Sequence, residues 1–499
     1  MEIEEKPIKV EITMETQSLK KEEKQSFKKI HYSLIIFMFI QVLWLLTFSE
    51  PLTVLFSQGQ PLIPILSDDI MSRTARYIMI YHSLAVPFLV ANTFWILEYY
   101  EVRTKLIPTL KILLLSGAYM VGSAGLVFAY TRIRLFHEIF YFGLFLVFLG
   151  GIIFVISAFP IPGKFPNPES DIRGSTFNGL NLEYMNLVIL AICVMVSTIM
   201  GAIAALENFT GTIWGLGRPP EAFLAESIIR QHHHDVVQDF VVSHLHIQLA
   251  QSAAMVLMVA YRTSKMSGAA YKYTLIGNAI GVIILSYGSW VLNHFVIWVG
   301  AGILIFCTMA VAIYGWKNVI ANKLGERYKS SSRGTKIKAL FKDPVNFTYY
   351  YLILFSHLFV TITGIIVGLQ VDEYYRLPET IELEYDFNVG HWHVLSVLIA
   401  MILILKSIDF FKVKGRQRQI LGWTFFIGST LAFGGADIYM LRRLPAENVQ
   451  PGLTIMFLGV WFLVVGVIWA FYAITKQFRL DHKEKESILA FEEPLTQER

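Results

Sequence analysis

The chain has 499 residues, of which 55% are hydrophobic and only 16% are charged. Together with a mean hydropathy of +0.52, this composition argues against a large soluble core and indicates a membrane protein. The formal net charge is +4 and the basic residues gather in particular loops, a pattern that does not suggest nucleic-acid binding. Cys193 and Cys307 both lie deep in apolar runs, so neither a disulfide nor a thiolate metal site is expected.

Apolar stretches of bilayer-spanning length occupy residues 30–476 and recur about twelve times. Residues 1–29 are rich in charge and are expected to form a cytoplasmic tail, and residues 477–499 a second one. No Cys-x-x-Cys-His motif occurs, which excludes covalently attached c-type haem on this chain. The predicted segments are 30–49, 77–99, 108–130, 138–160, 184–206, 237–261, 272–295, 297–317, 346–370, 389–409, 419–441 and 452–476.

The distribution of Lys and Arg over the loops predicts the orientation in the membrane. Loops 103–105, 262–272, 317–342 and 412–418 are basic, whereas the loop 372–386 is acidic. An even number of segments with both termini in the cytoplasm satisfies this pattern. The fold class is therefore an all-α polytopic membrane protein.

Five histidines fall in one layer of this topology, in the outer third of the membrane. They are His82, His244, His294, His391 and His393. His82 and His244 are expected about 8 and 10 Å below the outer ends of their segments, at 1.5 Å per residue. A buried imidazole without a partner costs several kcal/mol, roughly 2–7 by transfer scales. Histidines with only structural roles would not be expected to share one layer, so the placement favours a cofactor site.

The tetrapeptide Gly390-His391-Trp392-His393 opens the tenth segment. Two helical residues two positions apart point about 200° away from each other. His391 and His393 therefore cannot easily share one ligand, but they can serve two flat cofactors on opposite sides of the helix. Haems, which need axial ligands, suit that geometry. A pair of hydrogen-bonded interface histidines is the competing interpretation.

This arrangement resembles the catalytic subunit of haem-copper oxidases: twelve helices, histidines in the second, sixth and seventh, and His-x-His in the tenth. The resemblance implies that His82 and His393 bind a low-spin haem and that His391 is the proximal ligand of a high-spin haem. Arg442 and Arg443, which follow the eleventh segment, resemble the arginine pair that binds haem propionates.

The sixth segment points to one branch of that superfamily. The run from His244 to Gln248 is similar to the His-Leu-Trp-Val-Glu pattern of nitric-oxide reductases, and no tyrosine follows until Tyr261. His294 is similar to a non-haem metal ligand of the reductases. The chain departs from their pattern twice, because one of three metal-binding histidines is missing and Gln248 replaces a glutamate. An Asn293 register would resemble nitric-oxide dismutases.

The resemblance implies a respiratory electron-transport enzyme of a prokaryotic plasma membrane, most similar to nitric-oxide reductases. Its cofactors would be two haems, expected to be b-type, and one non-haem iron or copper bound by His244 and His294, with Gln248 beside them. Membrane lipid, a small electron-accepting subunit and a quinol, cytochrome c or cupredoxin donor are the expected partners. An oxygen-reducing oxidase, a dismutase and a non-enzymatic haem subunit with a degenerate metal site remain alternatives.

Other polar residues of the apolar segments have structural as well as functional interpretations. Gln248 and Gln251 share the helical face of His244 and form either a proton path or interhelical hydrogen bonds. His246 points away from His244, and His357, in the middle of the ninth segment, is expected to bond a neighbour.

Overall fold

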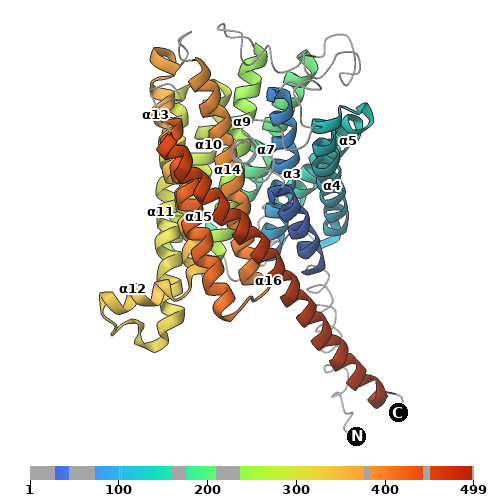
Figure 1. Ribbon diagram of the computed structural model, residues 1–499, viewed down its shortest axis with the longest axis vertical. Helices are drawn as coiled ribbons and strands as arrows, with labels where there is room; N and C mark the ends of the chain where they lie inside the picture. The colour runs from blue at the N-terminus through green and yellow to red at the C-terminus, as the bar shows by residue number, and fades with distance from the viewer. Residues whose placement is uncertain are drawn as a thin grey trace.

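The computed structural model describes residues 28–43, 73–100, 102, 104–159, 176–208, 236–375, 381–441 and 450–496. These residues form an all-α bundle (Figure 1). The long helices are residues 28–43, α3 (Arg73–Tyr99), α4 (Ile107–Thr131), α5 (Arg134–Ala158), α7 (Leu182–Asn208), α9 (Val236–Ser264), α10 (Gly268–Trp290), α11 (His294–Leu324), α13 (Pro344–Leu369), α14 (Ile381–Phe410), α15 (Gly415–Met440) and α16 (Gln450–Thr496). The short elements are η2 (Thr104–Leu106), β1 (Thr176–Phe177), β2 (Leu180–Asn181), η5 (Gly325–Tyr328), α12 (Arg333–Phe341) and η6 (Val371–Tyr375).

Every predicted segment coincides with a long helix. Eight described helices are long and apolar enough to cross a membrane. These spans are Met79–Tyr99, Ile107–Thr131, Arg134–Ala158, Leu182–Ala202, Gly268–Trp290, His294–Tyr328, Pro344–Leu369 and Gly452–Asp481. The chain is an integral membrane protein.

Two boundaries differ from the predicted ones. The break between the seventh and eighth segments lies at 291–293 rather than near Ile297. Leu292 has a positive φ of 49°, which an α-helix cannot continue through. The second difference is α16, which continues to Thr496, so most of the predicted tail 477–499 is helical. Its Lys, Glu, Ala and Leu residues have high helix propensity and account for this.

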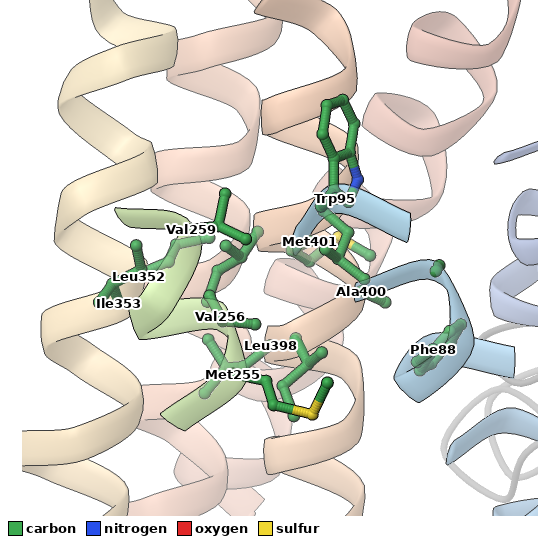
Figure 2. Close-up of a cluster of buried hydrophobic side chains, with 14 of the residues drawn as sticks. Phe88, Trp95, Met255, Val256, Val259, Leu352, Ile353, Leu398, Ala400 and Met401 are labelled. Atoms are coloured by element: carbon green, nitrogen blue, oxygen red, sulfur yellow. The ribbon is translucent and has the colours of Figure 1, made fainter. Parts of the chain in front are cut away.

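α9 and α14 form the centre of the bundle. Residues 253–261 of α9 and 394–408 of α14 are buried on every side of the helix, as expected of helices surrounded by others. Figure 2 shows Met255, Val256 and Val259 of α9 beside Leu398 and Met401 of α14.

One end of the bundle, here called the basic end, gathers ion pairs and α12. Lys28 Nζ lies 2.9 Å from Asp481 Oδ2, which joins the start of the first described helix to α16. Arg418, near the start of α15, bonds Asp343 before α13 and Asp409 at the end of α14, at 3.0 and 2.8 Å. Figure 1 shows α12 at the same end. The four helices that carry the candidate histidines have those residues toward the opposite end.

A β-hairpin precedes α7. β1 and β2 pair antiparallel, with Thr176 opposite Asn181. Asn178 and Gly179 connect them with φ of 48° and 77°, the left-handed conformations that a two-residue hairpin turn requires.

Candidate histidine site

His244 of α9 is fixed in one tautomer by α7. Its Nδ1 lies 2.6 Å from the backbone carbonyl oxygen of Ser197. A carbonyl only accepts, so Nδ1 carries the proton and Nε2 keeps its lone pair. Ligating histidines in metalloproteins are held in the same way, with the other ring nitrogen donating to a carbonyl.

A glycine on α7 makes room for this ring. A Cβ built on Gly201 would lie 2.8 Å from Cε1 and from Nδ1 of His244. Real Cβ atoms essentially never come so close, so a larger residue would push the imidazole away from Ser197. The glycine therefore helps to determine where the imidazole lies.

His82 of α3 lies against His244. The two ring centroids are 5.9 Å apart and the ring planes differ by 12°. Phe140 of α5 meets His82 edge-on at 6.2 Å. His82 and His244, from the second and sixth predicted segments, therefore lie side by side, as their predicted common depth in the membrane led us to expect.

The predicted pairing of His82 with His393 stays a prediction. The backbone of His393 belongs to α14, but its side chain lies outside the described part, as do Arg442 and Arg443. α14 is helical from Ile381 to Phe410. Because that helix is continuous, the sequence argument that His391 and His393 point about 200° apart holds for their backbone positions.

His391 and His294 meet the same helix, α13. A Cβ on Gly364 would lie 3.2 Å from Cε1 of His391, and a Cβ on Gly368 would lie 3.6 Å from Cδ2 of His294. The two glycines are one turn apart, about 6 Å along the helix. α13 therefore brings together the histidines predicted to bind the high-spin haem and the non-haem metal.

His391 retains an unsatisfied nitrogen. Its Nδ1 is buried and makes no hydrogen bond within the described residues. Phe387, one turn earlier on α14, covers the ring at 5.1 Å. His246 of α9, which was expected to point away from His244, lies close enough to His391 for the two rings to interact electrostatically.

His294 occupies a different element from the predicted one. It begins α11 and does not end the helix before it. Asn293 caps α11, because its side-chain oxygen accepts a hydrogen bond from Val296 N at 3.2 Å. The cap uses the oxygen of Asn293, and His294 is exposed at the helix start.

Gln248 and Gln251 join α9 to its neighbours. Gln248 Nε2 donates to Thr198 Oγ1 of α7 at 3.0 Å. Gln251 Nε2 donates to Ser286 Oγ of α10 at 2.7 Å. Both side chains therefore form the interhelical hydrogen bonds that the sequence left as one of two interpretations.

Two further polar residues lie buried in the bundle. His357 of α13 has its Nδ1 3.1 Å from the Ile353 carbonyl oxygen, one turn earlier, which is the structural bond expected for it. Asp437 of α15 was not among the residues predicted from the sequence. It is buried, its Oδ1 has no partner among the described residues, and it lies within hydrogen-bonding reach of Thr363, next to Gly364. An ionisable residue within an apolar segment was the available signal.

The donor chemistry of the described histidines fits haem better than a closed metal site. Within the described ranges, no group of three or more His, Cys, Asp or Glu side chains is placed to hold a metal ion. An axial haem ligand requires only one imidazole. The buried, unsatisfied nitrogen of His391 meets that requirement, and the Nε2 lone pair of His244 is available to a second metal.

Comparisons with known proteins leave the family open. No protein-family model matches the chain, and a search of curated proteins finds no similar sequence. The fold and its candidate spans define an all-α integral membrane protein with histidines from several helices at one end of the bundle.

Proposed function

We propose that this chain is a respiratory oxidoreductase of the haem-copper oxidase superfamily that reduces nitric oxide. The reaction is 2 NO + 2 e⁻ + 2 H⁺ → N₂O + H₂O. All twelve long helices would cross the membrane, with both termini in the cytoplasm. One observation carries the proposal: His82, His244, His294 and His391 come from four helices and gather at the end of the bundle opposite the basic end.

The cofactors follow from the positions of the histidines. His391 would bind a high-spin haem, His82 and His393 a low-spin haem, and Arg442 and Arg443 their propionates. When bound, the haems supply electron transfer and a site for a diatomic gas. The donor, a quinol or a cytochrome c or cupredoxin, would act from outside this chain.

His244 and His294 would hold a non-haem iron or copper. Ser197 keeps the ring of His244 in one orientation, with Nε2 free to coordinate. Gln248 lies one turn away on α9 and is bonded to Thr198. A neutral amide held in this way can orient a neighbouring group but cannot deliver a proton, so protons would reach the site by another route.

A second function, a haem subunit that transfers electrons without catalysis, is favoured by the same polar contacts. The side-chain amide of Gln248 is hydrogen-bonded to Thr198 of α7, and the described residues contain no group of three metal ligands. In that case the haems would be present and the second metal absent.

The test uses the purified full-length protein. Optical spectra should show one low-spin and one high-spin haem, and carbon monoxide should bind only the latter. His391→Ala should remove carbon monoxide binding and His393→Ala the low-spin signal. His137→Asn is the matched control: this histidine packs between Phe128 and Tyr141 and its loss should change neither spectrum. A single bis-histidine spectrum would contradict the proposed enzyme.

Gas analysis separates the remaining reactions. Under anaerobic conditions with a reductant, nitric oxide should be consumed and nitrous oxide formed. Nitrogen together with oxygen would indicate dismutation, and oxygen consumption without nitrous oxide would indicate a terminal oxidase. Intact haems with no gas consumed and no second metal would favour the electron-transfer subunit.

A further inference from the structure

The connection between α11 and α13 contains a short helix that lies outside the bundle. The connection comprises residues 325–343 and includes η5 and α12. Figure 1 shows α12 lying crosswise to α11 and α13 at the basic end. Ser332 caps α12 by accepting a hydrogen bond from Thr335 N at 3.3 Å. A membrane-spanning role is excluded by its nine residues.

Two large apolar side chains of α12 are partly exposed. Ile337 is 55% exposed and Phe341 is 41% exposed. They are four residues apart and therefore share one side of the helix. Ala339, 3% exposed, faces the protein instead. Exposed apolar side chains on a short surface helix are typical of a helix that lies in a membrane interface.

The surroundings of Phe341 place α12 at that depth. Its ring meets Phe347 of α13 at 5.0 Å and Trp423 of α15 at 5.8 Å. Phe347 lies in the first turn of α13 and Trp423 about two turns into α15, both toward the basic end. Aromatic residues at the ends of spans mark the level of the lipid headgroups.

The charges of the connection are mostly positive. Its acidic residues are Glu326 and Asp343, and its six basic residues are Arg327, Lys329, Arg333, Lys336, Lys338 and Lys342. Lys323 lies 3.8 Å from Asp343, and Lys336 lies over the ring of Tyr328 at 4.8 Å. Lys329, Arg333, Lys338 and Lys342 make no ion pair with the described part of the chain.

We propose that α12 is a docking surface for anionic phospholipids of the leaflet at the basic end. Ile337 and Phe341 enter the boundary between headgroups and acyl chains, and Lys338 and Lys342, beside them, bind the lipid phosphates. Charge complementarity selects this occupant, because unpaired cations at an anionic membrane surface are attracted to its phosphates. The inference is independent of the proposed enzymatic function.

The experiment measures lipid retained by the full-length protein. Native mass spectrometry counts the phosphatidylglycerol and phosphatidylcholine molecules that remain bound after exchange into mixtures of the two lipids. Wild-type protein should retain phosphatidylglycerol preferentially. Lys338→Gln/Lys342→Gln should weaken that preference roughly thirtyfold, given about 1 kcal/mol for each basic residue near an anionic surface.

The matched control removes equal charge at the same end. Lys414 and Arg416 precede and open α15 and are exposed, and Lys414→Gln/Arg416→Gln should change the preference less than twofold. Ile337→Ser/Phe341→Ser should lower retention of both lipids, and circular dichroism of each variant should match the wild type. An unchanged preference in the lysine variant, or an equal loss in the control, would overturn the proposal.

Discussion

Glu183 provides the sharpest test of the packing at the basic end. Its side chain is fully buried and lies 2.5 Å from Arg262, which is 8% exposed. The hydroxyl of Tyr271 donates to the other carboxylate oxygen, and Arg262 stacks on Tyr100 at 4.7 Å. Glu183→Leu would leave the guanidinium buried without its counter-ion, so we expect a loss of about 3–5 kcal/mol in the free energy of unfolding.

The assay compares this variant with its partners in a detergent-based unfolding titration. Glu183→Leu/Arg262→Met removes both charges and should recover most of the loss, because apolar residues can replace a buried ion pair with little net cost. Asp481→Asn is the control, since the Lys28–Asp481 pair is partly exposed and should contribute less than about 1 kcal/mol. Arg262→Met alone completes the comparison. If the losses of Glu183→Leu and Arg262→Met simply add in the double variant, the pair is not coupled and the reasoning fails.

Three further variants test other contacts with the same titration. A Cβ at Gly459 of α16 would overlap the backbone nitrogen of Ala432 in α15. Gly459→Ala should therefore lower the free energy of unfolding by about 1–3 kcal/mol, although alanine has the better helix propensity. Unchanged stability would mean that the two helices can separate without cost. Asn293→Ala should lose about 1 kcal/mol because Val296 N loses its cap, whereas Asn293→Asp should keep it; equal losses in both would exclude capping as the cause. Asp437→Asn should be neutral or stabilising by about 1 kcal/mol, because a neutral amide costs less to bury than a carboxylate. A loss of stability would reveal an interaction that requires the carboxylate.

The helices themselves were predictable because their cause is local. A bilayer demands a fixed length of apolar chain, and each predicted segment matched a long helix. The cytoplasmic location of the tail 477–499 stays a prediction, but its helical structure was not predicted. Hydropathy locates where a membrane span stops, whereas α16 continues into polar residues that also favour helix.

The candidate site was predictable only to the level of which histidines come together. Topology placed His82 and His244 at similar depths, and their rings lie 5.9 Å apart. Contacts with residues distant in sequence could not be foreseen. The carbonyl of Ser197 that orients His244 belongs to a residue type present in many places, and only the helix packing reveals that Gly364 and Gly368 face His391 and His294.

The element assignment of His294 shows how one residue can change a prediction. The apolar run continues through 291–293, so hydropathy gives no boundary there. The positive φ of Leu292 and the side-chain cap of Asn293 create it. A cap residue directly before an apolar run was a usable signal, and it would have placed His294 at the start of a helix.

The central position of α9 and α14 has a consequence for how the protein is made. These helices carry His244 and His391, and the glutamines of α9 are hydrogen-bonded to its neighbours, Gln248 to Thr198 of α7 and Gln251 to Ser286 of α10. The packing of α9 is therefore complete only when helices synthesised before and after it are in place. The histidines can meet only once α14 has joined the earlier helices, so any cofactor that bridges them would be acquired late in assembly.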